Sequence, residues 1–596
     1  MTSDIQILES AVVRFAGDSG DGMQLTGNQF TNSTALSGSD LATFPDFPAE
    51  IRAPIGTTFG VSAFQINFGA KSIKTVGDEP DVLVAMNPAA LKVNLSNLRA
   101  GGMLVVDSGA FTKRNLAKAG YEESPLGTTM LDDYQVVDID ISRLTLEAVK
   151  EHGLGNKDAL RCKNMWTLGL VLWMFSRKRE PIAKWLNKKF AKHEAIAASN
   201  VAALNAGHAF GETAELSATF KRYQIGATKS EPGIYRTVTG SQALSWGIAK
   251  GGELANLQIV LGSYPITPAS SILHALSNMK ELGIVTFQAE DEIAAVCAAI
   301  GASYAGSLGV TSSSGPGIAL KGEAIGLAIT TELPLVIINS QRGGPSTGMP
   351  TKTEQSDLYQ AIYGRNGDAP MPVISTRSPG DCFEVAIEAC RLAVKYMTPV
   401  MLLTDGFTAN AAEPWQLPNL EALVPFPAKY AKAPEDGETF SWFKRDEKTL
   451  ARNWPKPGVK GTEHRIGGIE KDFDTGHISY DADNHQRMTD TRQAKIANIA
   501  NDIPRQEVLQ GEETGTLAVV GWGSTFGPIS EAVKAARSDG VKVSHIHIRH
   551  IHPFPSNLGA LLAGYDKILV PEMNTGQLKT VLRDTYLIDA KPLNKV

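Results

Sequence analysis

Short apolar runs alternate with longer amphipathic stretches along most of the chain. In the first third, β-branched and other apolar residues gather at 11–15, 81–87 and 101–109, and a helical pattern follows the first of these runs. Runs of this length, bounded by turn residues such as Gly and Asp, predict buried strands. Strands that alternate with helices favour a parallel α/β sheet.

The middle of the chain repeats this pattern with longer loops at the strand ends. The stretches "LQIVLGSYPITP", "GVTSSSGPG", "LPLVIINSQRGGPSTGMPT" and "PVMLLTDGF" each run from apolar residues into Gly, Ser, Thr and Pro. A further strand, Gly loop and helix follow near the end, in "TLAVVGWGSTFGPISEAVKAAR". In open α/β sheets, ligands bind where strands end in such loops, so the middle segment is the first candidate for a site.

We therefore predict a multidomain α/β protein. Its length of 596 residues exceeds what one hydrophobic core covers. The stretch after the middle segment is charged and rich in Pro and Gly, which predicts a connector that is ordered only in part. The predicted divisions are a first domain at 1–195, a linker at 196–232, a second domain at 233–425, a connector at 426–512 and a third domain at 513–596.

The composition narrows the class of protein. Hydrophobic residues make up 43% and charged residues 20%, which is typical of a soluble globular protein. The net charge is −6 and no basic tract occurs, so nucleic acid is not expected as the main partner. No apolar run approaches the length of about 18 residues that a membrane span requires. The start of the chain lacks a basic segment before its apolar residues and does not read as a signal peptide, so we expect a cytoplasmic location.

The four cysteines, Cys162, Cys297, Cys382 and Cys390, do not form a C-x-x-C pair. An iron–sulfur cluster or a structural zinc site held by this chain is therefore not expected. We predict reduced thiols that pack as small apolar side chains.

Three acidic residues, Glu290, Asp291 and Glu292, crowd the start of a predicted helix whose apolar positions recur at helical spacing. One explanation is structural, because the helix dipole favours acids in the first turn. The other is functional, because a carboxylate turned into an apolar pocket has a raised pKa and can share a proton with a ligand nitrogen. Spacing alone leaves both explanations open.

Three loops carry groups suited to anions. The segment Thr311–Gly317 can present backbone N–H groups. Arg342 lies among glycines, and a guanidinium binds carboxylates bidentately. Thr267 stands between Pro265 and Pro268, which fix the backbone and lack a donor of their own. Ordinary turns and a solvated arginine are the structural alternatives.

Taken together, the motifs point to one family. The stretches "YPITP", "QAEDE" before a helix with "GAS", "TSSSGPG" and "RGGPSTGMPT", in this order and spacing, resemble the α subunit of 2-oxoacid:ferredoxin oxidoreductases. The first segment, with "GDSGDGMQ" and "FPDFPAEIRAPIGTT", resembles the γ domain of the same family, fused in front. The second domain would then be the thiamine-pyrimidine-binding, transketolase-like domain, and the last resembles a transketolase C-terminal-like domain. The resemblance covers nearly the whole chain.

This resemblance implies roles for single residues. Glu292 precedes Gly301 by nine residues, the spacing at which related thiamine enzymes carry the glutamate that bonds N1′ of the aminopyrimidine and favours its imino tautomer. Glu290 is the reserve candidate. Thr267 and Arg342 would hold the substrate carboxylate, with Thr351 nearby. The expected cofactor contacts besides Glu292 are Tyr264, Pro265, Ile266, Ser313 and Gly315.

Other parts of a thiamine site are missing from the sequence. Gly20-Asp21-Gly22 looks like the start of a magnesium and diphosphate motif, but no Asn follows at the required distance and the motif lies in the wrong segment, so we reject it as a metal site. The same stretch departs from the dinucleotide fingerprint. The resemblance therefore implies a separate β subunit that carries Mg²⁺, a [4Fe-4S] cluster and the diphosphate contacts, in an (αβ)2 assembly.

The implied reaction interconverts 2-oxoglutarate, coenzyme A and oxidised ferredoxin with succinyl-CoA, CO2 and reduced ferredoxin. Arg52 occupies a place where the family can carry a basic residue from the γ domain, and we expect it to meet the distal carboxylate of 2-oxoglutarate. Pyruvate or another 2-oxoacid is the alternative substrate. A non-catalytic binding or scaffold subunit is the alternative of another class, and the set Glu292, Thr267 and Arg342 disfavours it.

Overall fold

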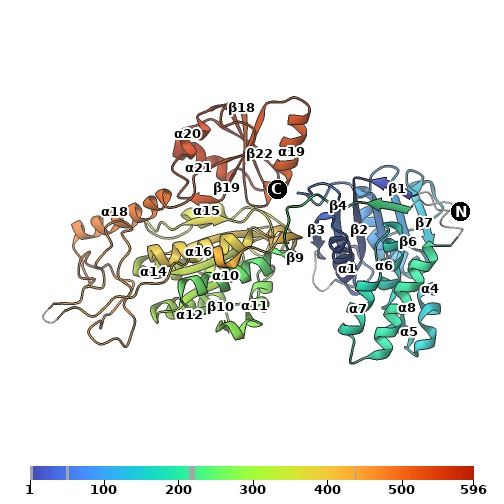
Figure 1. Cartoon of the computed structure of the whole chain (residues 1–596), viewed down its shortest axis with the longest axis horizontal. Coiled ribbons are helices and arrows are strands. Elements are labelled where there is room, and N and C mark those ends of the chain that lie inside the picture. The colour runs from blue at the N-terminus through green and yellow to red at the C-terminus, as the bar shows by residue number, and fades with distance from the viewer. Residues whose placement is uncertain (1–4, 49–52, 214–221, 436–437) are drawn as a thin grey trace. The chain divides into compact units, whose positions relative to one another are not determined.

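The computed structural model describes residues 5–48, 53–213, 222–435 and 438–596. The chain divides into two compact units. The first comprises Met1–Thr237 with Ala411–Leu417, and the second comprises Val238–Asn410 with Pro418–Val596. Figure 1 shows helices and strands in both units, which confirms the multidomain α/β class.

The first unit is built on a six-stranded sheet. Its strand order is β3-β4-β2-β5-β6-β7, with β2, β5, β6 and β7 parallel to one another and β4 antiparallel to both of its neighbours. The sheet is mainly parallel, as predicted, and β4 is the antiparallel exception, because the described part of the β3–β4 connection holds no crossover helix. The strands are β2 (Ser10–Asp18), β3 (Asp40–Asp46), β4 (Val61–Gly69), β5 (Val82–Ala85), β6 (Met103–Asp107) and β7 (Gln135–Ile139).

Two helices of the first unit pack with their backbones in contact. They are α6 (Lys163–Met174) and α8 (Glu194–Gly211). A Cβ added at Gly207 would lie 1.8 Å from the carbonyl oxygen of Trp166, and one at Gly169 would lie 2.1 Å from that of Leu204. Only glycine allows the two helix backbones to approach this closely, so helix packing requires glycine at both positions.

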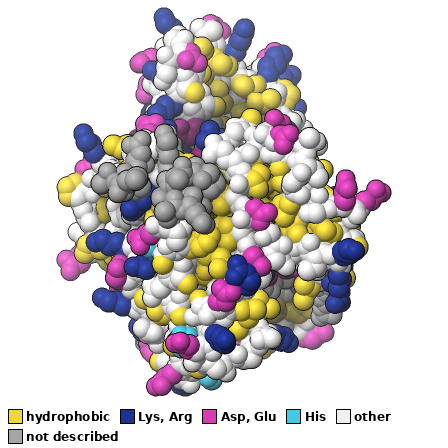
Figure 2. Space-filling view, turned by 90° about the vertical axis from the view of Figure 1, so that its right-hand side faces the viewer, with side chains coloured by type: hydrophobic (Ala, Val, Ile, Leu, Met, Phe, Trp, Pro, Cys, Tyr) yellow, Lys and Arg dark blue, Asp and Glu magenta, His cyan; other side chains and the backbone are white. Residues whose placement is uncertain are grey.

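Figure 2 shows one face of the molecule, on which Lys and Arg side chains alternate with Asp and Glu and apolar side chains lie between them. No broad area of one charge sign stands out on this face, in keeping with the modest net charge of −6. Within the described residues, none of the helices combines the length and the hydropathy that a membrane crossing needs.

The second unit contains a seven-stranded sheet whose order is β11-β10-β12-β13-β15-β14-β20. All neighbours are parallel except β20, which runs antiparallel to β14. The strands are β10 (Ile259–Ser263), β11 (Val285–Gln288), β12 (Leu308–Ser313), β13 (Leu335–Gln341), β14 (Val373–Ser375), β15 (Pro399–Asp405) and β20 (His550–His552). Because β11 lies on one side of β10 and β12 on the other, the strand order reverses there, which is where open α/β sheets form a ligand crevice.

Helices cover this sheet. The helix α12 (Glu292–Tyr304) packs on β10 and β12, while α10 (Gly240–Ala255) pairs with α16 (Cys382–Tyr396). Shorter helices follow the strand ends, namely α11 (Ser270–Ser277), α13 (Gly315–Leu320), α14 (Gly322–Thr331) and α15 (Leu358–Tyr363). Because the strands run parallel, the loops at their carboxyl ends all lie along one edge of the sheet.

A smaller five-stranded sheet ends the chain, with the order β17-β19-β18-β21-β22, and lies beside the larger sheet in Figure 1. Gln355 joins the two parts, since its side chain donates to the carbonyl of Trp522 at 2.7 Å and accepts from the N–H of Met573 at 3.2 Å. The bounds are β17 (Val508–Gln510), β18 (Gly515–Trp522), β19 (Val543–Ile548), β21 (Tyr565–Glu572), β22 (Ala590–Asn594), α19 (Phe526–Ser538), α20 (Leu558–Leu562) and α21 (Gln577–Tyr586).

The connector has little regular structure until α18 (Ala482–Asn498). It is anchored by Glu332, which has no exposed surface and pairs with Arg445 at 2.5 Å and with Lys495 at 2.7 Å. These two cations hold the pKa of Glu332 far below its usual range, against the effect of burial. A buried carboxylate with two partners therefore ties the connector to the end of α14.

Candidate functional site

The three clustered acids have different surroundings. Asp291 caps α12, because its Oδ1 accepts from the N–H of Ala294 at 2.7 Å. Glu290 is exposed. Glu292, the first residue of the helix, is only 9% exposed. The structural explanation therefore holds for Asp291, while Glu292 is the acid turned toward the interior.

A Gly-Pro-Gly turn lies against two carboxylates. A Cβ added at Gly317 would lie 2.9 Å from Cγ of Glu292, and one at Gly315 would lie 2.9 Å from Oδ2 of Asp357. The hydroxyl oxygens of Ser313 and Ser314 are buried and lack a partner among the described residues. Buried hydroxyls normally find a partner, so this turn offers donors and acceptors to a ligand.

Arg342 follows β13 directly and is 7% exposed. Its Nη1 donates to the carbonyl oxygen of Thr267 at 2.7 Å, and its Nε is buried without a partner among the described residues. Burial lowers the pKa of Arg342, while the carboxylates of Asp357 and Glu292 oppose this effect. The loops after β10 and β13 are thus joined, with part of the guanidinium still free to bind an anion.

A cavity of about 770 Å³ opens beside this arginine. Asp357 contributes to its wall, receives a hydrogen bond from Nδ2 of Asn339 at 3.0 Å, and has a pKa raised by burial. Glu354 accepts from the hydroxyl of Ser356 at 2.7 Å. The lining comprises Gly315, Pro316, Ala319, Leu320, Arg342, Gly344, Pro345, Ser346, Glu354, Ser356, Asp357, Gln360, Asn574, Thr575, Gln577 and Val596.

Lys321 is a further residue of this region, and its side chain has no exposed surface. Its ammonium donates to the carbonyl oxygen of Glu292 at 2.7 Å. Burial lowers the pKa of Lys321 to about 8, and the nearby carboxylates of Glu292 and Asp291 act in the opposite direction. Sequence analysis did not select this lysine, because a single lysine at the end of a short apolar helix is typical of a solvated surface.

The other predicted residues lie on the same edge of the sheet. Tyr264 and Pro265 are exposed, Ile266 and Thr267 are half-buried after β10, and Thr351 is half-buried in the loop after Arg342. Ser313 ends β12 and Gly315 begins α13. Arg52 falls outside the described residues.

None of the four cysteines forms a disulfide; Cys162, Cys382 and Cys390 are buried and Cys297 is exposed. The prediction that all four pack as small apolar side chains is therefore wrong for Cys297, which lies on the outer face of α12. Among the described residues, no group of three or more His, Cys, Asp or Glu side chains is arranged to hold a metal ion.

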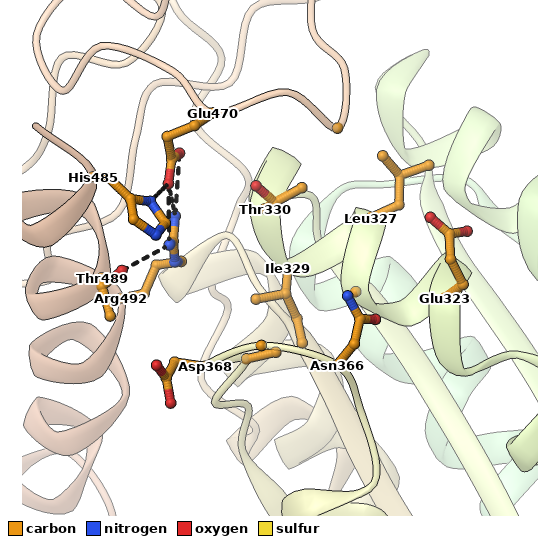
Figure 3. A pocket seen from close by; sticks show the side chains of 14 residues that line it. Glu323, Leu327, Ile329, Thr330, Asn366, Asp368, Glu470, His485, Thr489 and Arg492 are labelled. Atoms are coloured by element: carbon orange, nitrogen blue, oxygen red, sulfur yellow. Dashed lines mark hydrogen bonds and ion pairs between the residues drawn. The ribbon is translucent and has the colours of Figure 1, made fainter. Parts of the chain in front are cut away.

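A second cavity, of about 390 Å³, lies elsewhere in the second unit (Figure 3). On one wall His485 and Arg492 converge on Glu470, with His485 Nδ1 at 2.8 Å from its Oε2. Glu323 and Asn366 lie on the opposite side. The charged groups of the first wall satisfy one another, whereas the groups around Glu292 do not, so we place the functional site at the strand ends.

What the strand-end groups can do chemically follows from their arrangement. A buried carboxylate, hydroxyls without partners among the described residues and a partly free guanidinium lie at the carboxyl ends of β10, β12 and β13. The carboxylate can hold a proton at a ligand nitrogen, and the guanidinium can bind a carboxylate. Asp357 and Lys321 complete this set, and neither was selected from the sequence.

Comparisons with known proteins show the family of the chain. Residues 254–479 match the family described as pyruvate flavodoxin/ferredoxin oxidoreductase, thiamine diphosphate-binding. Residues 12–210 match the pyruvate ferredoxin/flavodoxin oxidoreductase family, and residues 516–591 match core domain II of pyruvate:ferredoxin oxidoreductase.

Individual proteins match over most of the chain. The chain is 54% identical over 593 residues to the 2-oxoglutarate oxidoreductase subunit KorA of Mycobacterium tuberculosis, covering 100% of this chain and 90% of that protein. It is 29% identical over 540 residues to 2-oxoacid:ferredoxin oxidoreductase 1, subunit alpha, of Aeropyrum pernix, covering 83% and 81%. The structure of 2-oxoglutarate:ferredoxin oxidoreductase from Magnetococcus marinus, with 2-oxoglutarate, coenzyme A and succinyl-CoA bound, superposes with a TM-score of 0.84 at 29% identity and covers 99% of this chain and 96% of that one.

Proposed function

Because this chain belongs to the 2-oxoacid:ferredoxin oxidoreductase family, we propose that it is the α subunit, with a fused γ domain, of a 2-oxoglutarate:ferredoxin oxidoreductase. The reaction converts 2-oxoglutarate and coenzyme A into succinyl-CoA and CO2, releases one proton, and passes two electrons to ferredoxin. The observation that carries the proposal is Glu292, a buried carboxylate at a helix start on the ligand-binding edge of the sheet.

The residues at this edge fit the aminopyrimidine half of thiamine diphosphate. Glu292 offers a carboxylate to a ring nitrogen, and the hydroxyls of Ser313 and Ser314 are buried without partners among the described residues. The glycines at 315 and 317 leave room that a Cβ would fill. When bound, thiamine diphosphate supplies the carbon nucleophile and the electron sink that decarboxylation of a 2-oxoacid requires.

Glu292 controls where a proton is held on the cofactor. Its carboxylate holds a proton at N1′ of the aminopyrimidine, and its place at the start of a packed helix fixes the direction in which the proton is held. Gly317 allows the side chain to lie close to the turn after β12, because a Cβ there would be 3.1 Å from Oε1 of Glu292. Tyr264, Pro265, Ile266, Ser313 and Gly315 line the same crevice in this proposal.

Arg342 and Thr267 position the substrate. The guanidinium pairs with the carboxylate next to the keto group, and its bond to the carbonyl of Thr267 fixes its orientation. Thr351 belongs to the loop that follows. These groups would hold the 2-oxoacid by the carboxylate that is released as CO2.

A dicarboxylate substrate needs a second positive group. The cavity beside Arg342 also contains Glu354 and Asp357, which would repel a second carboxylate. Because a buried unpaired charge is costly, the distal carboxylate must meet another cation. We assign that role to Arg52.

The remaining parts of the enzyme come from other chains. We assign Mg²⁺, the diphosphate contacts and the [4Fe-4S] cluster to a β subunit, with coenzyme A as co-substrate handled by the γ domain and ferredoxin as electron partner. The assembly would be (αβ)2 and would work in the cytoplasm. The full-length match to a protein named as a subunit supports a multi-subunit enzyme.

Reconstitution with the β subunit tests the proposal. The pair should reduce ferredoxin with 2-oxoglutarate and coenzyme A, and Glu292→Gln should abolish this activity while the pair still assembles. Faster turnover with pyruvate or a branched-chain 2-oxoacid would reassign the substrate. Full activity of Glu292→Gln would overturn the catalytic proposal and leave a binding or scaffold role.

A further inference from the structure

A buried lysine without an acidic partner contacts the backbone of Glu292. Lys321 stands between α13 and α14, has no exposed surface, and is among the largest fully buried side chains of the chain. Its ammonium donates to the backbone carbonyl of Glu292 at 2.7 Å, and no carboxylate of the described residues forms an ion pair with it. A buried ammonium in this state is costly, so its retention calls for an explanation.

Two other buried lysines show what is particular about this one. Lys495 is paired with the carboxylate of Glu332. Lys471 is 2% exposed, donates only to the carbonyls of Gly467 and Ile469, and has a pKa lowered to about 8, like Lys321. The two lysines differ in location. Lys471 bonds to a turn of the connector, whereas Lys321 bonds to the first turn of the helix that carries Glu292.

The surroundings of Lys321 do not need a charge for packing. Ile318 on α13 and Ile325 on α14 are buried near it in the sequence, and Val296 on α12 belongs to the same apolar cluster. A methionine side chain has a similar length and would suit such surroundings. The ammonium therefore serves something other than the filling of space.

We propose that Lys321 is a positioning residue for Glu292, which fixes the first turn of α12 and holds a positive charge beside the carboxylate that receives the cofactor nitrogen. This inference rests on the proposed function. It explains how the first turn of α12, and with it the side chain of Glu292, is held in place before the cofactor binds.

Other charged groups face the same region and must be considered. Asp291 and Cys297 lie on or at the start of α12 and act on Lys321. Arg342, after β13, and Asp357, before α15, act on each other, and Arg342 also acts on Glu292. Of the two cations near Glu292, Arg342 keeps its charge throughout the accessible pH range. Lys321 is the cation that changes charge near neutrality, because burial lowers its pKa to about 8.

The consequence is a pH dependence with a defined sign. Below about pH 8 the ammonium is charged and holds the helix start. Above it the positive charge near Glu292 is lost, so affinity for thiamine diphosphate should fall as pH rises through 8.

The test uses the reconstituted α–β assembly with Mg²⁺. Binding of thiamine diphosphate is followed by tryptophan fluorescence between pH 6.5 and 9.5 for the wild type, Lys321→Met and the matched control Lys471→Met, together with kcat and KM. We expect Lys321→Met to weaken binding at pH 7 by about tenfold, the loss of one hydrogen bond to a charged group, and to show no step near pH 8. Lys471→Met should match the wild type in affinity and in pH profile.

Thermal unfolding separates positioning from a loss of structure. Because the folded state disfavours the charged lysine, Lys321→Met should unfold at the same or a higher temperature than the wild type while it binds more weakly. Wild-type affinity with an unchanged step in Lys321→Met overturns the inference, as does the absence of a step in the wild type. Glu292→Gln is measured alongside: if it leaves binding and activity intact, the proposed function fails, and if it abolishes activity while Lys321→Met has no effect, only the role of Lys321 fails.

Discussion

Replacing Gly317 by alanine tests the packing of the site against Glu292. Helix propensity alone predicts a gain, because alanine in a helix is favoured over glycine by about 0.5–1 kcal/mol. The structure predicts the opposite, because the new Cβ would lie 2.0 Å from Oγ of Ser313 and 2.9 Å from Cγ of Glu292. Ser313 is fully buried and ends a central strand, so both its hydroxyl and the side chain of Glu292 must shift to admit the new methyl group.

The magnitude follows from weighing these two effects. Overpacking of this kind costs about 1–3 kcal/mol, which offsets or exceeds the propensity gain and leaves a net loss of about 0–2.5 kcal/mol in folding. The effect on function is larger, because a displacement of about 1 Å in a positioned group costs roughly 100-fold in activity. We therefore expect Gly317→Ala to lower kcat of the reconstituted enzyme about 100-fold with only a small loss of stability.

Gly301→Ala is the matched control on α12. Outside its own helix, no heavy atom of the described residues lies within 4 Å of the added Cβ. The substitution should stabilise the isolated chain by about 0.5–1 kcal/mol. The assay is calorimetric unfolding of the isolated chains together with ferredoxin reduction and thiamine diphosphate binding in the assembly. If Gly317→Ala stabilises the chain as much as Gly301→Ala and retains full activity, the close packing of Glu292 on the turn after β12 is refuted.

Three further predictions address the connector and the substrate. Glu332→Gln should lower the free energy of unfolding by about 3–5 kcal/mol, because two buried cations lose their partner. The pKa of Glu332 is depressed in the fold, so the stability that its carboxylate contributes is present above the ordinary carboxyl pKa and is lost on acidification. Calorimetry should therefore show the unfolding temperatures of wild type and variant converging toward low pH. Arg342→Lys should raise KM for the 2-oxoacid at least tenfold, since an ammonium cannot replace a bidentate guanidinium, and an unchanged KM in steady-state kinetics would exclude Arg342 from substrate binding. Arg52→Ala should raise KM for 2-oxoglutarate more than for pyruvate, and equal effects on the two substrates would dismiss its contact with the distal carboxylate.

The sequence was sufficient for the arrangement of strands and loops around the site. Runs such as "LQIVLGS" and "LPLVIINSQ" are strands because they are continuous, apolar and bounded by turn residues, and they do form β10 and β13. Since parallel strands end at one edge, the loops with Thr267 and Arg342 had to lie on the same edge of the sheet, and the structure adds the hydrogen bond that joins them.

The pairing of strands that are far apart in the chain could not be predicted from the sequence. Periodicity does not reveal which strands become neighbours, so the antiparallel edge of the first sheet and the return of His550–His552 to the larger sheet could not be predicted. These pairings depend on how the connections pack, and not on the residues of one strand.

Burial was the other missing quantity. The helix dipole favours all three acids at the start of α12 equally, and only the structure separates the capping Asp291, the exposed Glu290 and the buried Glu292. In the same way a lysine between two short helices is usually solvated, so the burial of Lys321 could not be read from its position. The exposure of Cys297 was missed because its spacing matches the apolar face of the helix.

The location of thiamine diphosphate in the assembled enzyme tests the central claim most directly. A cryo-electron microscopy map of the α–β assembly with the cofactor and Mg²⁺ should show N1′ of the aminopyrimidine within about 2.6–3.2 Å of the Glu292 carboxylate, with the diphosphate held by the partner chain. A map in which the cofactor lies wholly within the partner, away from Glu292, would contradict the claim that this chain supplies half of the active site.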